Sequence, residues 1–417
     1  MSLTGLLIFL TITAGSIVVA GIIARPGRPL IAHAAIVLGL GLLLRLGGAA
    51  AYSVMTKEPY LLTRAPFSDE KVFVRASSWY MSHPGDWYRE LALHRSTRFS
   101  AALHGLRLLT PNSGPSGLRL ITVALSVSGI LAVWAAARRR LSSHSAFVAA
   151  LAGVIWPYAC QHDVGIVREP WMTFACGWSV ALLAALERRP LARYVTGAMA
   201  SYFFYLLQPH AAFCVAVAFL LAEFGAPLAR LPRATRIAVV ILGIAGFAVV
   251  GGMLSLKVYY QQALVEDIIE GYTRRGEGGS AFWMPGPDAP LWLLWATNSG
   301  QYWLGGLFIG MTSASRLLGL VDYAFWLPIY GAAIKHLGRG RWARMGRPER
   351  FAVACFVFYN VLSMGYVNNV GQSVRKRNAF GIAMIYVMAS ALSAAHEASA
   401  GVRSALAHHK ERLRVVE

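Results

Sequence analysis

Long runs of apolar residues, separated by shorter polar segments, form the main pattern of this chain. The runs are continuous rather than alternating, and their length is close to the 17–25 residues or so with which a helix crosses a bilayer. Only helices and closed barrels satisfy their backbone in lipid, so continuous runs indicate helices. The predicted helices lie at 4–24, 30–52, 118–137, 145–160, 171–187, 192–207, 211–226, 237–256, 317–335, 351–367 and 379–396.

The expected fold is therefore all-α: a polytopic helical membrane protein of about 11 transmembrane helices in a single domain, 1–417. Composition agrees with this class, because 56% of the residues are hydrophobic and only 14% are charged, whereas soluble domains carry about 25% charged residues. The four cysteines lie in or at the ends of apolar runs. They lack the spacing of a metal site or disulfide framework, so we interpret them as packed thiols.

Lysine and arginine concentrate in every second loop, which predicts that these loops are cytoplasmic. The N-terminus is then outside, the C-terminus is cytoplasmic, and the net charge of +20 follows mostly from this topology. No basic face is interleaved with stacking aromatics, so nucleic acid is not an expected partner. A signal peptide is the alternative for the run at 4–24, but that run lacks a basic start, and Arg25 and Arg28 follow it.

The alternate, external loops carry the candidate chemistry. There are two large ones, 53–117 and 257–316, and a Trp-rich stretch at 290–303 in the second resembles an interfacial or re-entrant segment more than a full span. The basic loops are short and have neither a phosphate-cradling glycine motif nor a pair of acids. We therefore expect the functional site on the external face.

Asp69 and Glu70 are adjacent carboxylates near the membrane surface, where unpaired charge is costly. Ser68 precedes them, apolar residues follow at helical spacing, and Pro84 ends the stretch, so we predict an external amphipathic helix. Capping this helix is one role for the two acids. Handling a proton or a phosphorylated sugar at the bilayer edge is the other.

The loop at 161–170 gathers Asp163, Arg168 and Glu169 between two apolar runs. Charges this close to lipid usually pair, so Arg168 is expected to bind Asp163 or Glu169. His162 and His210 both lie at external ends of apolar runs, but too few ligands have suitable spacing for zinc, and we expect no metal.

Arg375, Lys376 and Arg377 precede the last apolar run on the side where the positive-inside rule disfavours cations. Binding of a lipid phosphate would explain this exception, and interfacial snorkelling is the alternative. Arg45 lies within an apolar run, where it either snorkels or pairs with Asp322.

Several of these segments resemble one family, the GT-C superfamily of polytopic glycosyltransferases, which includes protein O-mannosyltransferases and lipid A aminoarabinose transferases. The resemblance is carried by Phe67-Ser68-Asp69-Glu70, by the stretches 99–140 and 156–170, and by the basic turn at 374–380. It covers about the first 225 residues and the segment near 375. Unlike the family pattern, this chain has an additional apolar run at its N-terminus.

The resemblance implies a membrane enzyme without a cofactor that transfers a sugar from a polyprenyl-phosphate-linked donor to a hydroxyl or amine. The acceptor is a glycan, lipid or protein, and the site faces the exterior or periplasm of what we expect to be a bacterial inner membrane. Asp69 is implied as the base, with Glu70 as the next candidate or its orienting partner. The residues implied to bind the phosphate or sugar hydroxyls are Arg375, Arg377, Lys376, Arg168, Asp163 and Glu169.

Two alternatives remain open at this point. A polysaccharide polymerase or ligase using pyrophosphate-linked glycans would depend more on arginines of the large loops, such as Arg274 and Arg275. A transporter or flippase of lipid-linked sugars would carry more charge inside the runs, and repeat symmetry between its halves.

Overall fold

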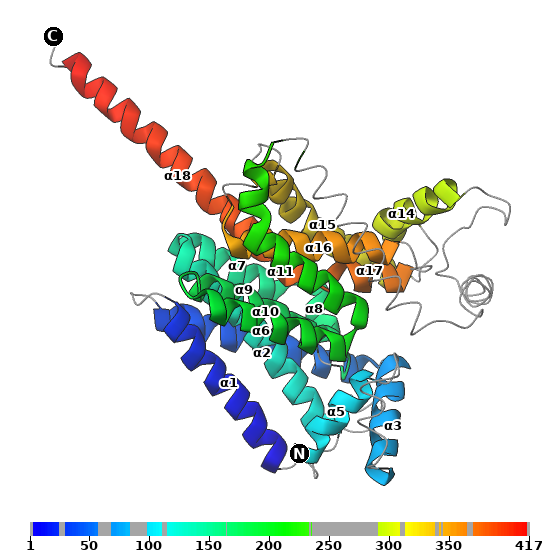
Figure 1. The fold of residues 1–417 in the computed structure, drawn as a ribbon. Helices are drawn as coiled ribbons and strands as arrows, with labels where there is room; N and C mark the ends of the chain where they lie inside the picture. The colour runs from blue at the N-terminus through cyan, green and yellow to red at the C-terminus, as the bar shows by residue number, and fades with distance from the viewer. Residues whose placement is uncertain are drawn as a thin grey trace.

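The computed structural model describes residues 3–24, 30–56, 68–83, 98–110, 115–163, 165–232, 235, 291–308, 313–337, 342, 345–364 and 370–414. Within these ranges the chain is helical and contains no strand, which confirms the all-α prediction (Figure 1). The helices with the sequence-predicted apolar runs are α1 (Leu3–Ile23), α2 (Leu30–Thr56), α6 (Pro115–Arg140), α7 (Ser143–Ile155), α8 (Pro157–His162), α9 (Glu169–Ala185), α10 (Pro190–Leu207), α11 (Pro209–Arg230), α15 (Ser313–Leu337), α16 (Arg347–Met364) and α18 (Gly381–Arg414). The predicted run at 237–256 lies outside the described residues.

Three of the described helices are long and apolar enough to cross a membrane: Leu3–Ile23, Gly117–Arg140 and Gly381–Ser399. Shorter apolar helices accompany them at Ala32–Gly48, Ser143–Ile155 and Pro209–Gly225. These features agree with a helical membrane protein. Helix α18 continues to Arg414, well past the predicted end at 396, and its C-terminal part projects from the body (Figure 1).

Four further helices lie between the apolar runs. The first large loop contains α3 (Ser68–Ser82) and α5 (Arg98–Leu109), which pack against each other. The Trp-rich stretch forms α14 (Leu291–Phe308), where Tyr302 donates a hydrogen bond to Oδ1 of Asn360 at 2.7 Å. The three adjacent basic residues belong to α17 (Val370–Asn378).

The run predicted at 145–160 consists of two helices rather than one. Helix α7 ends at Ile155, and α8 begins at Pro157 after the non-helical Trp156. Proline has no backbone N–H, so it cannot donate to the carbonyl four residues earlier. The carbonyls of the last turn of α7 therefore need other partners.

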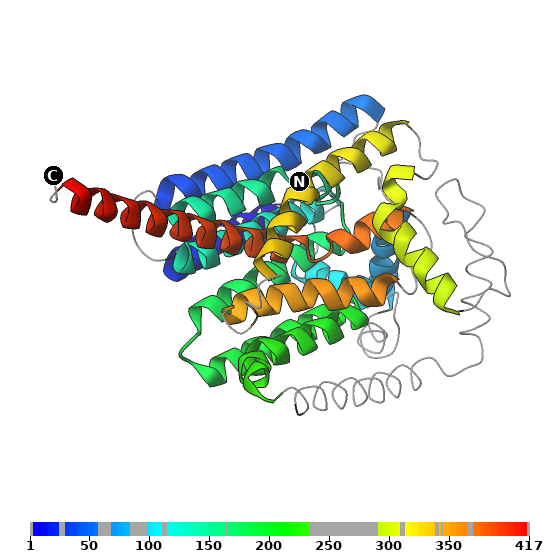
Figure 2. The same ribbon diagram turned by 90° about the horizontal axis from the view of Figure 1, so that it is seen from above.

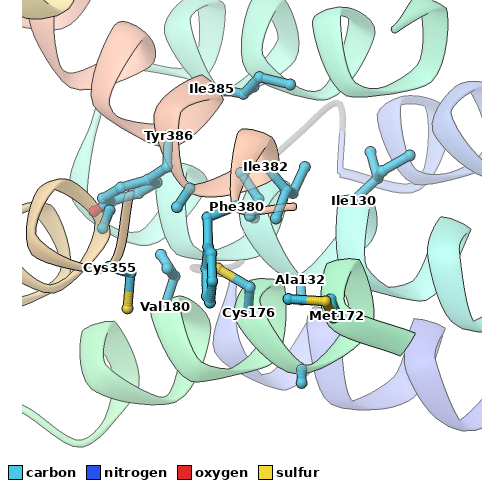
Figure 3. Packing of buried hydrophobic residues seen from close by; sticks show 14 of the residues in the cluster. Ile130, Ala132, Met172, Cys176, Val180, Cys355, Phe380, Ile382, Ile385 and Tyr386 are labelled. Carbon is cyan, nitrogen blue, oxygen red and sulfur yellow. The ribbon is translucent and has the colours of Figure 1, made fainter. Parts of the chain in front are cut away.

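The core is built around α6, which packs against α1, α7 and α9. Helices α6 and α9 cross in backbone contact at Gly129 and Gly177, where a Cβ on either residue would collide with the other helix. Small residues allow this close approach between membrane helices. Beside the crossing, Cys176, Cys355, Phe380 and Tyr386 are buried in one apolar cluster (Figure 3). All four cysteines are free thiols, as expected from the sequence.

The ends of the helices meet in two groups. At the Arg140 end, Nη1 of Arg139 donates to the carbonyl of Ile23 at 3.1 Å, and Arg140 pairs with Glu187 at 3.0 Å. At the opposite Glu169 end lie α3, α5, α8 and α17. Helices α11 and α16, which lie side by side, run between the two ends (Figure 2). Arg140, Arg193 and Arg347, from three of the basic loops, thus lie near one another at the Arg140 end through their contacts with Glu187 and Glu223.

Candidate functional site

Helix α3 begins at Ser68 and ends before Pro84, as predicted. Its buried residues recur at helical spacing and are Glu70, Phe73, Ser77 and Tyr80. This face packs on α5, where Phe73 meets Phe99 edge to face at 4.8 Å. The backbone of Asp69 lies in the first turn of the helix, one turn before Phe73. The side chain of Asp69 lies outside the described part of the chain.

Glu70 forms a buried ion pair with Arg119 of α6. Nε and Nη2 of Arg119 each lie 2.8 Å from Oε1 of Glu70, and each side chain is 1% exposed. The sequence suggested Glu70 as a second candidate base but did not identify Arg119 as its partner. Because a buried carboxylate held by two guanidinium nitrogens is tied to that partner, this pairing supports a structural role for Glu70, with Asp69 next to it in the same turn.

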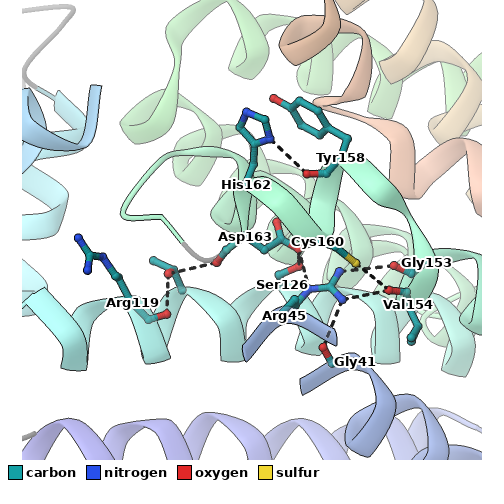
Figure 4. A network of polar contacts seen from close by, with 11 residues as sticks. Gly41, Arg45, Arg119, Ser126, Gly153, Val154, Tyr158, Cys160, His162 and Asp163 are labelled. Carbon is teal, nitrogen blue, oxygen red and sulfur yellow. Dashed lines mark hydrogen bonds and ion pairs between the residues drawn. The ribbon is translucent and has the colours of Figure 1, made fainter. Parts of the chain in front are cut away.

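Asp163 pairs with Arg45, which corrects two expectations. Nε of Arg45 donates to Oδ2 of Asp163 at 2.8 Å, and the hydroxyl of Ser126 also donates to this oxygen (Figure 4). Arg45 therefore neither snorkels nor binds Asp322, and Asp163 is not the partner of Arg168. The pair links α2 to the segment after α8, a long-range contact that no local pattern indicates.

Arg45 also contacts backbone carbonyls at the break between α7 and α8. Its Nη1 donates to the carbonyl of Val154 at 3.2 Å, and its Nη2 approaches the carbonyl of Gly153 at 3.5 Å (Figure 4). Gly153 stands four residues before Pro157, so its carbonyl has lost the normal helical donor. The charged residue inside the apolar run at 30–52 is thus explained, because one guanidinium binds both Asp163 and the carbonyls at the helix break before Pro157.

Glu169 forms a two-point ion pair with Arg375. Nε of Arg375 donates to Oε1, and Nη2 donates to Oε2 at 3.2 Å. Burial raises the pKa of the Glu169 carboxyl, but the adjacent Arg375, with Arg168 and His162 nearby, outweighs burial and lowers this pKa to about 2. Glu169 is therefore ionised, and it is not the partner of Arg168 that we expected.

Arg168 instead lies over the ring of Phe73, with its guanidinium carbon 5.3 Å from the ring centroid. This cation–π contact joins the loop before α9 to the buried face of α3. Together with the Glu169–Arg375 pair, it brings α3, the start of α9 and α17 to one place. These are the three segments that the sequence singled out.

The three cations of α17 contact four other helices. Arg375 binds Glu169 of α9, and Nζ of Lys376 lies 3.3 Å from the hydroxyl of Tyr359 of α16. Nη1 of Arg377 donates to the carbonyl of Trp303 in α14 at 2.6 Å, and also contacts the hydroxyl of Tyr323 in α15. Helix α17 is thus anchored on several sides, and its cations are held in defined positions.

Asp322 of α15 is a buried acid at this end that the sequence analysis did not place in the site. Its Oδ2 accepts a hydrogen bond from Nδ2 of Asn378 at 3.2 Å. Asn378 directly follows the three cations of α17, so this hydrogen bond places the Asp322 carboxyl near them. The isolated acid in a mostly apolar helix was the signal that could have identified it.

The two histidines at this end do not share a site. His162 stacks on Tyr158 at 4.0 Å, whereas His210 stacks on Tyr359 at 5.5 Å. Burial lowers the pKa of His162 to about 4, and Arg375 acts in the same direction, so the imidazole is neutral near pH 7. Among the described residues, no group of three or more His, Cys, Asp or Glu side chains could hold a metal ion.

The arrangement therefore brings together an acid-bearing helix, an arginine over an aromatic ring and a helix with three oriented cations. Cations held in this way can bind an anionic group. Comparison of the chain with models of protein families, with curated proteins and with solved structures found no match.

Proposed function

We propose that this protein is a membrane glycosyltransferase of the GT-C type, which transfers a sugar from a polyprenyl-phosphate-linked donor to an acceptor hydroxyl or amine. The observation that carries the proposal is that the start of α9 connects α3 and α17 at the Glu169 end. Arg168 lies over Phe73 of α3, and the adjacent Glu169 binds Arg375 of α17, although α3 and α17 lie about 300 residues apart in the sequence.

The reaction assigns a role to each part of this site. The acceptor oxygen attacks the anomeric carbon, the bond from that carbon to the phosphate oxygen breaks, and polyprenyl phosphate leaves with the electron pair. Asp69 takes the acceptor proton, a contribution of about 10²–10⁴-fold for a positioned base. Arg375, with Lys376 and Arg377 beside it, stabilises the charge that develops on the phosphate.

The remaining acids organise the site rather than react. Glu70 fixes α3 on α6 through Arg119, and Asp163 fixes the loop before α9 through Arg45. Glu169 orients the guanidinium of Arg375. Arg168 lies over Phe73 of α3 and directly precedes Glu169, where it can contact the sugar or its phosphate.

The proposed topology has 11 transmembrane helices, the N-terminus and the Glu169 end outside, and the Arg140 end in the cytoplasm. It rests on the concentration of arginine and lysine in the loops of the Arg140 end. In a bacterium, the protein would lie in the inner membrane with its site facing the periplasm.

The test compares Asp69→Asn with Glu70→Gln in purified protein reconstituted in lipid nanodiscs. A panel of polyprenyl-monophosphate hexoses and aminopentoses is supplied with an extract of cell-envelope acceptors, and the release of polyprenyl phosphate is measured by mass spectrometry. We expect Asp69→Asn to abolish release while its thermal unfolding stays as in the wild type. Glu70→Gln should lower the unfolding temperature because it weakens the buried pair with Arg119.

Unchanged release by Asp69→Asn would remove this residue as the base. If the wild type moves lipid-linked sugar across vesicles without releasing polyprenyl phosphate, the protein is a transporter and the proposal fails. Release that depends on pyrophosphate-linked glycans and on Arg274 and Arg275, which lie outside the described residues, would favour a polymerase or ligase.

A further inference from the structure

An apolar groove lies between α1, α6 and α9, away from the candidate site. Its volume is about 280 Å³. The residues that line it are Thr11, Ile12, Gly15, Ser16, Val19, Leu125, Phe174 and Trp178. Helix α1 provides most of this lining, and α1 is the helix that the family resemblance does not account for.

The polar groups beside the groove bond to one another. The hydroxyls of Ser16 and Ser128 lie 2.5 Å apart, and Nε1 of Trp178 donates to the Ser128 hydroxyl at 2.9 Å. The hydroxyl of Thr11 donates to the carbonyl of Leu7 within α1. The groove therefore presents no unmet hydrogen-bonding group, and it suits an occupant made only of hydrocarbon.

Beyond the lining residues Val19 and Trp178, toward the Arg140 end, α1, α6 and α9 are tied together. Arg139 of α6 donates to the carbonyl of Ile23 in α1 at 3.1 Å, and to the carbonyl of Ala184 in α9 at 3.1 Å. A chain in the groove would therefore stop before Arg139.

The side of the groove opens toward membrane hydrocarbon. Helix α1 is one of the candidate membrane spans, and only 17% of its apolar window is buried in the protein. Its outward residues are large and apolar: Leu7, Val18, Val19 and Ile22 are all exposed. Apolar cavities of about 150 Å³ accept a benzene-sized molecule, so this groove has room for roughly ten carbon atoms.

We propose that one acyl chain of a glycerophospholipid occupies this groove as a resident lipid. The bilayer supplies such chains at the open side of α1, and an extended chain reaches about 15 Å, half the hydrocarbon thickness. The bound chain completes the packing of α1 on α9, which otherwise touch mainly through α6. This site does not depend on the proposed glycosyltransferase activity.

Gly15 and Gly21 provide a matched pair of variants for the test. A Cβ at either position meets nothing within 4 Å, so both accept a larger side chain, but only Gly15 lines the groove. We expect Gly15→Trp to fill the groove and Gly21→Trp to leave it open. Val19→Trp, from an exposed position on the groove's edge, is a second filling variant should Gly15→Trp fail to fold.

The measurement is native mass spectrometry of the full-length protein released from membranes in mild detergent. We expect the wild type and Gly21→Trp to retain one glycerophospholipid per chain, and the filling variant to retain about tenfold less, equivalent to about 1.4 kcal/mol. Equal retention by the filling variant, or no retained lipid in the wild type, overturns the proposal. A retained mass that belongs to a polyprenyl lipid also overturns it, and would assign the groove to the sugar donor instead.

Discussion

Arg375 of α17 and Glu169 of α9 form a two-point ion pair across 206 residues of sequence. The pair joins the segment with three adjacent cations to the loop that the sequence marked as rich in charge. It also fixes the plane of the Arg375 guanidinium, and a group so fixed loses little freedom when it binds a phosphate.

The first prediction concerns the energy of this pair. Glu169→Gln and Arg375→Gln should each lower the free energy of unfolding by about 1–3 kcal/mol, because each leaves a partly buried charge without its partner. The double variant should cost less than the sum of the two, with a coupling of about 1–2 kcal/mol. Thermal unfolding of the wild type, the two single variants and the double variant in one detergent measures this coupling. Additive losses would contradict the pairing.

The second prediction concerns pH. The pKa of Glu169 is lowered from 4.5 to about 2 in the folded protein. A lowered carboxyl pKa stabilises the fold above the unfolded-state value, and this contribution is lost as the pH falls through the folded-state value. The difference in unfolding temperature between wild type and Glu169→Gln should therefore be constant above pH 4.5 and shrink toward pH 2. A difference that grows on acidification would contradict the assignment.

The third prediction concerns Arg45. Arg45→Leu should destabilise the protein by about 3–5 kcal/mol, because it leaves Asp163 buried without its cation and removes the donor to Val154. Glu187→Gln is the control: Glu187 pairs with Arg140 but is 52% exposed, so its loss should cost no more than about 1 kcal/mol. Unfolding temperatures measure both. Equal effects of the two variants would mean that Arg45 does not support the helix break.

The apolar helices could be predicted from the sequence because burial in lipid imposes a continuous local pattern. The run at 171–187, for example, corresponds to α9 within two residues at each end. The break at Trp156 and Pro157 was not predicted, although a proline inside an apolar run ends or kinks a helix and was a signal for it. The length of α18 was not predicted either, because its distal part has no apolar run to mark it.

The partners of the charged residues could not be predicted in the same way. Arg168 stands five residues from Asp163 and beside Glu169, so proximity in sequence suggested a pair. In the structure, Asp163 pairs with Arg45 and Glu169 pairs with Arg375, and both arginines come from helices far away in the chain. Which charge pairs with which depends on how α2 and α17 pack on the bundle, and a single sequence holds no signal for that packing.

The last prediction concerns the crossing of α6 and α9. Gly177→Ala should destabilise the protein by about 1–3 kcal/mol, because the added methyl group collides with the backbone of α6 at Gly129. Backbone cannot move aside as a flexible side chain can, so the two helices must separate and lose the packing around them. Gly21→Ala, where a Cβ meets nothing within 4 Å, should leave the unfolding temperature unchanged or slightly raised. A loss of stability in Gly21→Ala equal to that in Gly177→Ala would show that the cost does not come from the crossing.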